Sequence, residues 1–415
     1  MDSIKSETKK IILWSNALVG MGGAERLLFE EAKYFQKNGF ETHILTFNFN
    51  EEVLFNHTYK LKIEQIGRPL NSSLSLLANI IYGIANILAL RRKLIQIKPD
   101  IILLSNYFDC LSFYFATLFT PYFYAIHLHG TMFWFENDLI KYAFIHRKVF
   151  NEIRESVIGH KEFIPATMPK VSLGWKTVKE IAAIVIYRGI KKAKKVFVLS
   201  NQIKWEVKKL YGKEAVVLKG AFPDEIFDYK LKQDIKKKLG LENKKMILNV
   251  NRLDQRKRLA LLIKAFNQVI KDFDDAILVI GGVGPDEARL KSLAKELGLK
   301  DKVKFVGYIK EEELWDYLAA CDIFVHPNWA DFAIAAYEPL ALQKKVVWST
   351  EMEIDENLKK NKHIFVANPT VDDFAQAIKK ALITRVTEKN DLSLYTWNNY
   401  CGRILKELRE IMSDK

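Results

Sequence analysis

From Met246 to Arg258 the chain reads MILNVNRLDQRKR. The apolar run 246–250 is typical of a buried parallel strand, and apolar residues at helical spacing over 259–266 predict a helix after it. A loop with four cations therefore joins this strand to this helix. Basic groups at the carboxyl end of a strand, beside the free N–H groups of a helix N-terminus, suit a diphosphate. A solvated basic loop is the alternative interpretation.

Further apolar runs of strand length alternate with helical stretches along the chain, and this alternation predicts parallel sheets with helices on both faces. Because 415 residues exceed one ordinary hydrophobic core, we expect two domains. The prediction is two Rossmann-like, doubly wound α/β domains, 1–222 and 223–396, with the helix in 397–415 packing back on the first. A charged helix over 231–239 opens the second half. The expected strands are 11–14, 42–47, 101–105, 123–127, 196–199, 216–218, 246–250, 276–281, 303–306 and 323–326.

The composition is that of a soluble globular protein, with 49% apolar and 27% charged residues. Three widely separated cysteines without metal-binding spacing favour a reducing compartment and argue against a disulfide or zinc framework. The polar segment 1–10 does not resemble a cleavable secretory signal. Two apolar segments, 74–90 and 107–126, are interrupted by polar residues and are interpreted as core helices rather than membrane spans. Contact of their faces with a bilayer surface is the alternative.

The positive charge is local, since residues 141–220 carry +12 of the net +14. Such a segment suits an anionic partner: a phospholipid surface, a lipid-phosphate carrier or a nucleic acid. A solvated helix face is the alternative. No RRM, KH or zinc-finger signature accompanies the charge, so nucleic acid ranks lowest.

Two motifs in the first half lie where strands end. Gly22 and Gly23 follow the first strand and precede an amphipathic helix, but they form neither the GxGxxG pattern nor a P-loop with its lysine. His127 and His129 lie two apart, hence on one face of a strand that ends at Gly130. An imidazole there could donate to a phosphate or orient an acceptor hydroxyl, although a structural histidine is the alternative.

Five short motifs follow one another along the chain: GGAER at 22–26, NRL at 251–253 with Lys257 after it, GVGP at 282–285, FVGY at 305–308, and Asp331-Phe332 followed by Glu338. In this order and spacing they resemble the GT-B fold glycosyltransferases of family 4. The resemblance spans nearly the whole chain and is most specific from Met246 to Val347. It implies two domains that face each other across a cleft, the N-terminal one for the acceptor and the C-terminal one for the donor.

The resemblance also implies residue roles. Arg252 and Lys257 would hold the donor diphosphate and stabilise its charge as the sugar leaves. His129, or less readily His127, would lie near the reacting sugar. Glu338 would accept hydrogen bonds from the ribose hydroxyls. The remaining donor-binding residues implied are Gly22 and Gly23 at the phosphates, Tyr308 and Ile309 along the base, and Gly282, Asp331 and Ile334.

One departure from the family pattern concerns its paired acidic motif. Ala330 stands where the first glutamate is expected, and Ala333 stands where a glycine is usual. The first glutamate normally touches the transferred sugar, so its loss implies a changed donor contact or an inactive site. Asp331 could replace it if the loop rotates, or could cap the following helix.

The function implied is a retaining, metal-independent glycosyltransferase that needs no cofactor. It would move a sugar from a UDP- or GDP-linked donor to a hydroxyl of a glycan or lipid-linked acceptor. The protein would be cytoplasmic and peripheral on an anionic membrane face, and would not bind nucleic acid. The second hypothesis is a catalytically inactive nucleotide-sugar-binding subunit of a glycosylation complex.

Overall fold

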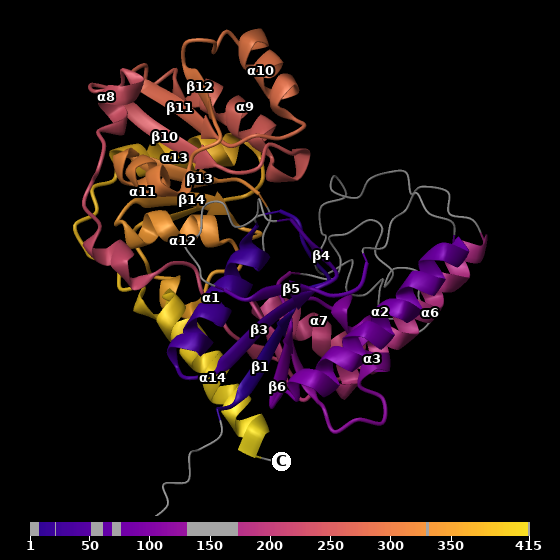
Figure 1. The fold of residues 1–415 in the computed structure, drawn as a ribbon. Helices are drawn as coiled ribbons and strands as arrows, with labels where there is room; N and C mark the ends of the chain where they lie inside the picture. Colours follow the sequence, from indigo (N-terminus) through magenta and orange to yellow (C-terminus); the bar gives the residue numbers. More distant parts are fainter. Residues whose placement is uncertain are drawn as a thin grey trace, which may run out of the picture. The chain divides into compact units, whose positions relative to one another are not determined.

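The structure is a computed structural model that describes residues 8–20, 22–50, 61–68, 76–130, 173–328 and 332–413. The chain forms two compact units: unit 1 comprises residues 1–219 and 398–415, and unit 2 comprises residues 220–397. Each unit contains a fully parallel sheet flanked by helices (Figure 1). The predicted fold class, two doubly wound parallel-sheet α/β units, is confirmed.

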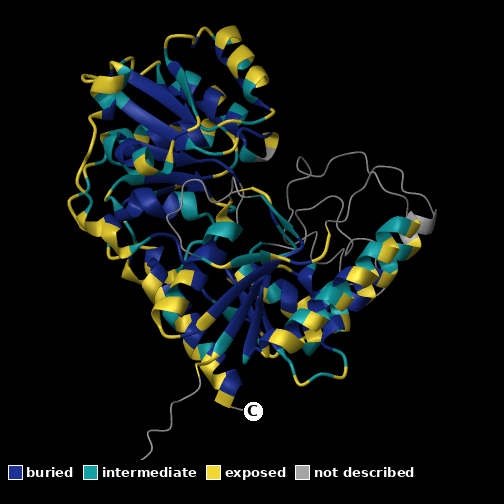
Figure 2. Cartoon of the chain, viewed as in Figure 1, coloured by how far each residue is buried: buried dark blue, intermediate teal, exposed yellow. Residues whose placement is uncertain are grey.

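The sheet of unit 1 has seven parallel strands. Their spatial order is β5 (Ile63–Gln65), β3 (Glu41–Thr46), β1 (Lys10–Trp14), β6 (Ile101–Leu104), β7 (Tyr124–Leu128), β8 (Val196–Val198) and β9 (Val216–Val217). The central strands β6 and β7 are buried along their whole length (Figure 2), as expected for apolar runs covered on both faces. The order reverses between β1 and β6, which makes their carboxyl ends the topological switch point of this unit.

The helices of unit 1 cover both faces of this sheet (Figure 1). They are α1 (Gly23–Lys37), α2 (Leu76–Ile97), α3 (Asp109–Ala116), α6 (Leu173–Lys192), α7 (Asn201–Tyr211) and α14 (Trp397–Ser413), and a short pair, β2 (Ala17–Leu18) and β4 (Asn48–Phe49), lies beside the sheet. The ends of α7 follow local chemistry: the Ser200 hydroxyl accepts from the Ile203 N–H at 3.1 Å, and Gly212 ends the helix at φ +60°.

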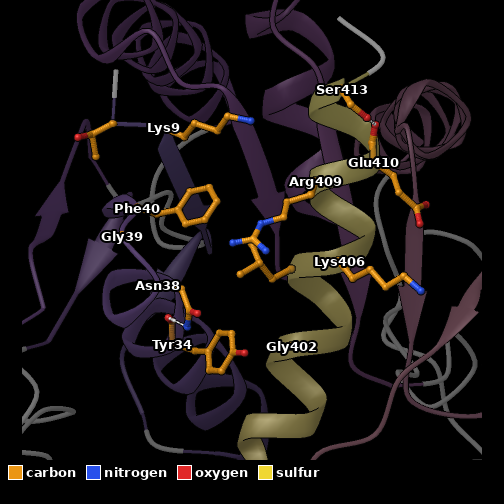
Figure 3. Close-up of a pocket in the computed structure, with 12 residues that line it drawn as sticks. Lys9, Tyr34, Asn38, Gly39, Phe40, Gly402, Lys406, Arg409, Glu410 and Ser413 are labelled. Carbon is orange, nitrogen blue, oxygen red and sulfur yellow. Dashed lines mark hydrogen bonds between the residues drawn. The ribbon is translucent and has the colours of Figure 1, made fainter. Parts of the chain in front are cut away.

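The C-terminal helix α14 lies against the elements that begin unit 1. Figure 3 shows Gly402 and Arg409 of α14 on one side of a surface pocket, and Tyr34 and Phe40 on the other. A Cβ atom added at Gly402 would lie 3.1 Å from the Tyr34 hydroxyl, so this close approach favours glycine. The pocket contains none of the site residues expected from the sequence.

The sheet of unit 2 has six parallel strands. Their order is β12 (Val303–Gly307), β11 (Ala276–Gly281), β10 (Lys245–Val250), β13 (Ile323–His326), β14 (Lys345–Ser349) and β15 (Ile364–Ala367). Side chains alternate across β10: Met246 and Leu248 join the core on one face, and Ile247 joins the core on the other. The order reverses between β10 and β13, which defines the switch point of unit 2.

Two helical layers cover the sheet of unit 2. One core contains residues of α8 (Ile235–Leu239), α11 (Glu311–Ala320) and α12 (Ile334–Ala341), and the other contains residues of α9 (Leu259–Val269), α10 (Glu287–Glu296) and α13 (Val371–Ile383). The helix predicted from residue 231 is shorter, because α8 begins only after Asp234, whose side chain accepts from the Lys237 N–H at 3.0 Å. Before it, the Lys232 N–H donates to Asp316 Oδ1 at 2.8 Å, which holds that residue outside the helix.

The two apolar segments examined for membrane spanning differ in the structure. Within the described residues, no helix is both long and apolar enough to cross a bilayer. In the segment 107–126 only Asp109–Ala116 is helical, so the predicted helix was too long: α3 buries Cys110 and Phe113 in the core, and the segment ends in strand β7. Helix α2 buries Leu90 and Leu94 but leaves other apolar side chains exposed, so it is a core helix on one side alone.

A buried carboxyl joins the two loops at the switch point of unit 1. Asp109 Oδ1 accepts from the Asn16 N–H at 3.1 Å, and Oδ2 accepts from the Ser105 N–H at 3.2 Å. Asn16 and Ser105 follow β1 and β6. Burial raises the pKa of Asp109 to about 8, although these hydrogen bonds favour the charged form.

We expect Asp109→Asn to lower the free energy of unfolding by about 1–3 kcal/mol, because an amide NH₂ would face one of the two backbone donors. Urea unfolding followed by circular dichroism measures the change. The exposed Glu242→Gln, which makes the same chemical change away from any such contact, should match the wild type. Equal urea midpoints for the two variants would contradict a stabilising role of the hydrogen bonds that Asp109 accepts.

Candidate functional site

The site expected in unit 2 lies where β10 and β13 end. The basic loop 251–258 follows β10 and contains a short 3₁₀ turn at Gln255–Lys257. Pro327 and Asn328 follow β13, and α12 begins at Ile334. Because ligands of doubly wound sheets bind outside the carboxyl ends of strands at the switch point, this edge is the candidate binding site. Trp329, Ala330 and Asp331 lie outside the described residues.

A glycine loop after β11 holds the start of the basic loop in place. The Leu253 N–H donates to the Val283 carbonyl at 3.0 Å, and the Asn251 N–H donates to the Gly281 carbonyl at 3.1 Å. Gly282 has φ +118°, and a Cβ atom there would lie 1.8 Å from the Asn251 carbonyl oxygen. A Cβ atom at Gly284 would lie 2.2 Å from the Leu253 carbonyl oxygen. The GVGP motif is therefore required for the two loops to interlock.

The cations of the basic loop have different environments. The Arg252 side chain is exposed and that of Lys257 is half-buried. His326 is the last residue of β13. Its burial, and secondly the nearby positive charge of Lys257, lower the pKa of His326 to about 3. Arg258 is buried at φ +52° and pairs with Glu351, which follows β14. Arg252 and Lys257 are thus less buried than Arg258, which anchors the loop.

Three buried polar side chains and the half-buried Asn251, all at the same edge, were not predicted as site residues from the sequence. Asn249 donates from Nδ2 to the Val325 carbonyl at 2.7 Å, which links β10 to β13. Several buried atoms have no hydrogen-bond partner among the described residues: Asn249 Oδ1, Asn251 Nδ2, Asn328 Oδ1 and both ring nitrogens of His326. Leaving such groups unsatisfied is costly, so they are suited to bind a polar ligand. The signal in the sequence was a polar residue in each of two otherwise apolar strands, Asn249 in β10 and His326 in β13.

Glu338 lies in α12, the helix that follows β13. Its carboxylate is buried, and Trp315 Nε1 of α11 donates to Oε1 at 3.4 Å. Helix α12 begins at Ile334, whose side chain packs on the core, and its N-cap residue Ala333 provides no side-chain cap. The first N–H groups of this helix therefore point toward the switch-point edge without a side-chain acceptor from the cap residue.

The two candidate residues in the loop after β12 differ in their exposure to solvent. Tyr308 is 62% exposed, whereas Ile309 is 8% exposed and packs on Gly281. A Cβ atom at Gly281 would lie 2.4 Å from Ile309 Cδ1. The Tyr308 ring is open to a ligand, while Ile309 could reach a nucleotide through its backbone alone.

Unit 1 has its own pocket at the switch point between β1 and β6. Helix α1 begins at Gly23 beside this pocket, Gly22 is its N-cap residue, and a Cβ atom at Gly22 would lie 2.9 Å from Glu25 Oε2. Polar groups from both strand ends and the rings of Phe47 and Phe108 form the walls. The lining includes Asn16, Glu25, Ser105, Asn106 and Phe108.

His127 and His129 occupy the end of β7 and the position after it. His127 is fully buried, and its Nδ1 lies 3.1 Å from Glu31 Oε1 of α1. The ring centroids of the two histidines are 4.3 Å apart. Burial lowers the pKa of both imidazoles to about 3, so both rings are neutral near pH 7. Sequence reasoning missed Glu31, which lies on the buried face of an otherwise ordinary amphipathic helix.

Part of the positive charge predicted to meet an anionic partner is paired within unit 1. Lys192 Nζ donates to the Thr117 carbonyl at 2.9 Å, and Lys213 Nζ donates to the Lys191 carbonyl at 3.1 Å. Lys195 pairs with Glu407 and Glu410 of α14. Residues 131–172, which contain Lys141, Arg147 and Lys148 of the +12 segment, lie outside the described residues. The described cluster is therefore less available to a partner than the charge count implied.

The chain thus combines two doubly wound, Rossmann-like units, each with polar groups at its switch point. Residues 232–395 match the model of the glycosyl transferases group 1, and residues 21–219 match that of glycosyltransferase family 4. The chain belongs to the GT-B glycosyltransferases of family 4.

Individual relatives are similar over part of their length. An uncharacterised glycosyltransferase of Methanocaldococcus jannaschii is 29% identical over 49% of this chain and 57% of its own length. Alpha-monoglucosyldiacylglycerol synthase of Streptococcus pneumoniae is 31% identical over 36% of this chain and 34% of its own. The alignments thus span about a third to a half of these relatives.

Solved structures share the whole fold. A glycosyltransferase from Rickettsia africae has a TM-score of 0.73 at 17% identity and covers 99% of this chain and 100% of its own. Anabaena HepE in complex with UDP-glucose has a TM-score of 0.66 at 16% identity, with 98% and 100% covered. At these identities the likeness shows the fold alone.

We expect Gly282→Ala to disrupt the interlocked loops, because the new methyl group would collide with a backbone carbonyl at a backbone angle that disfavours alanine. Thermal unfolding should show a drop in Tm of several degrees, corresponding to a loss of about 2 kcal/mol or more. Gly298→Ala is the matched control, since Gly298 also has a positive φ, +71°, but meets no atom within 4 Å. The same drop in both variants would mean that backbone strain alone, and not the loop contact, sets the cost.

Proposed function

We propose that the protein is a retaining glycosyltransferase that transfers a sugar from a nucleotide-diphosphate donor to a hydroxyl acceptor. The observation that carries the proposal is the edge of unit 2 at β10 and β13. There, the cations Arg252 and Lys257, buried polar atoms without hydrogen-bond partners among the described residues, and an interlocked glycine loop lie at one switch point. This combination suits a ligand with a diphosphate and several hydroxyl groups.

The donor-side residues would act by charge and position. Arg252 and Lys257 would neutralise the diphosphate and stabilise the charge that grows on it as the sugar leaves. The N-terminus of α12 would add backbone donors. Glu338 would accept hydrogen bonds from the ribose, and Tyr308 would lie beside the base. Because cationic side chains supply the neutralisation, the proposal includes independence from metal ions and from cofactors.

The reaction would take place on one face of the donor sugar. An acceptor oxygen forms a bond to the anomeric carbon from the side of the leaving group, and the bond from that carbon to the diphosphate oxygen breaks. The proton of the acceptor hydroxyl passes to the departing diphosphate. His129 would lie near the reacting sugar, as the family resemblance implies.

The acceptor would bind in the pocket of unit 1. Asn16, Ser105 and Asn106 offer amide, hydroxyl and backbone groups, and Phe108 offers an apolar ring face. Sugar rings combine polar edges with apolar faces, so such a lining suits a glycan. Glu25 adds a carboxyl whose pKa is raised by burial.

A membrane-bound acceptor is proposed from one surface of unit 1. The outer side of α2 exposes a stripe of apolar side chains at helical spacing: Leu77, Ile80, Ile81, Ile84 and Leu88. The exposed Arg92 follows this stripe on the same helix, next to Arg91, which donates to the Leu118 carbonyl at 2.9 Å. An apolar stripe next to cations suits the interface of an anionic membrane. The lipid product named for the Streptococcus pneumoniae relative supports a lipid acceptor, and we propose a peripheral location on the cytoplasmic face.

The alternative function is a catalytically inactive nucleotide-sugar-binding subunit. It is motivated by Ala330, which replaces the glutamate expected near the transferred sugar. Both functions require the donor site, so binding alone does not separate them. A thermal-shift screen with UDP, GDP and ADP and their sugars identifies the donor, because ligands of the native state raise Tm. Release of nucleotide diphosphate from that donor then separates enzyme from binding subunit.

We expect Lys257→Ala to reduce nucleotide diphosphate release at least 100-fold, because a buried diphosphate would lose one of its two cations. Glu338→Gln should weaken donor binding by about tenfold through the ribose contact. Lys264→Ala is the control, since Lys264 is exposed on α9, the helix that follows the loop. Release by wild type that Lys257→Ala leaves unchanged would exclude the proposed donor site.

We expect the double variant Ile81→Glu with Ile84→Glu to lose binding to vesicles that contain anionic lipid, because each new carboxylate would have to enter the apolar interface. Vesicle sedimentation at low and physiological salt measures the bound fraction. Ile383→Glu with Leu394→Glu makes the same change at two exposed apolar positions of unit 2. Wild-type protein that stays in the supernatant at every lipid composition rules out this surface.

A further inference from the structure

Three elements of unit 1 bring together a buried polar cluster, which we call the Glu31 network: Glu31 of α1, His127 of β7 and Tyr400 of α14. All three side chains are inaccessible to solvent. The Tyr400 hydroxyl donates to Glu31 Oε1 at 2.5 Å, and it lies 3.0 Å from His127 Nδ1. His127 Nδ1 lies 3.1 Å from the same carboxylate oxygen. The three atoms thus form a closed triangle.

The hydrogens in this triangle fix the tautomer of His127. The single hydroxyl hydrogen of Tyr400 is donated to Glu31 Oε1, so that oxygen and the Tyr400 oxygen both face His127 as acceptors. The Nδ1 atom must then carry a hydrogen, because two facing acceptors would otherwise repel its lone pair. His127 Nε2 is left as the bare nitrogen, and it has no hydrogen-bond partner among the described residues.

The network lies directly behind His129. The two imidazole rings pack edge to face, with centroids 4.3 Å apart and planes at 65°. Neither ring nitrogen of His129 has a hydrogen-bond partner among the described residues. The orientation of His129 therefore depends on its packing against His127, whose own orientation depends on Glu31 and Tyr400.

A carboxyl at position 31 is costly to bury. Apart from Glu30, which pairs with Lys33, the other buried residues of α1 are apolar, among them Leu27, Leu28 and Ala32. Burial raises the pKa of Glu31 to about 7, while the neighbouring His129 and the Tyr400 hydrogen bond oppose that shift. A leucine would fill a helix position of this kind at lower cost. Positions that break a local rule in this way often serve the site.

We propose that Glu31, held by Tyr400, is a positioning residue that fixes the tautomer and ring orientation of His127 and thereby the orientation of His129. The inference rests on the proposed function, in which His129 faces the reacting sugar. Glu31 touches neither substrate, so it would act through the histidine pair. It would affect turnover more than donor affinity, because the charged side chains proposed to bind the donor, Arg252, Lys257 and Glu338, belong to unit 2.

The sharpest variant is Glu31→Leu, which removes the acceptor while keeping a similar volume. The Tyr400 hydroxyl would then donate to His127 Nδ1, and the hydrogen of that ring would move to Nε2. Glu31→Gln retains an acceptor oxygen for Tyr400 and should retain the original tautomer. Glu30→Leu is the matched control, because Glu30 precedes Glu31 on α1 and pairs with Lys33 outside the network.

The tautomers are read by long-range ¹H–¹⁵N spectra of protein labelled at its eight histidines, with peaks assigned by replacing His127 and His129 in turn. At pH 8 we expect the Nδ1–H form of His127 in wild type, Glu31→Gln and Glu30→Leu, and the Nε2–H form in Glu31→Leu. In the transfer assay, Glu31→Leu should lower kcat about 10- to 100-fold with KM for the donor nearly unchanged. Glu31→Gln should retain most of the wild-type kcat.

Several results would overturn the proposal. If His127 of the wild-type protein has its hydrogen on Nε2, the proposal is wrong, and this result does not depend on whether Glu31→Leu folds. A changed tautomer with unchanged kcat would make the network purely structural. A stoichiometric metal ion in the purified protein that is lost in Glu31→Leu would assign Glu31, His127 and His129 to a metal site instead. If wild type releases no nucleotide from any donor, the proposed function fails, while the spectra still decide whether Glu31 controls His127.

Discussion

The interlock between the loop 251–253 and the glycine loop 282–284 is the constraint on which the donor half depends. Backbone groups of the two loops are joined directly, with no room for a Cβ atom at Gly282 or Gly284. This fixes the path of the chain as it leaves β10, so Arg252 is exposed at the sheet edge. The buried pair of Arg258 and Glu351 holds the other end of the same loop. A loop of high charge is thereby given one defined conformation.

In unit 1, a side chain rather than a glycine loop holds the loops at the binding edge in place. The two loops at its switch point are joined by Asp109, which accepts from one backbone N–H of each. The pocket that we assign to the acceptor opens at these loops. Both halves therefore place rigid backbone at the point where the strand order reverses. Rigid backbone at a binding edge reduces the entropy lost when a ligand binds.

Charge counts along a sequence do not show which charges are free to act. Arg258, Lys192 and Lys195 are all engaged by partners within their own unit. By contrast, α2 has a modest charge but an exposed apolar stripe beside the exposed Arg92. The membrane proposal thus rests more on exposed apolar area than on the +12 segment that first suggested an anionic partner.

The sequence by itself determined the fold class, ten of the strands and the family, because strand-length apolar runs and ordered motifs are local features of the chain. The strands β5, β14 and β15 and the short pair β2 and β4 were not predicted. The sequence also identified Arg252, Lys257 and Glu338 as candidates, whose roles stay predictions. Tertiary structure decided what each side chain faces. It buried Ile309 in the core and paired Arg258 with Glu351. It also brought Glu31, His127 and Tyr400 together from positions up to 369 residues apart. Burial and pairing of this kind depend on which distant segments meet, and no local pattern encodes that.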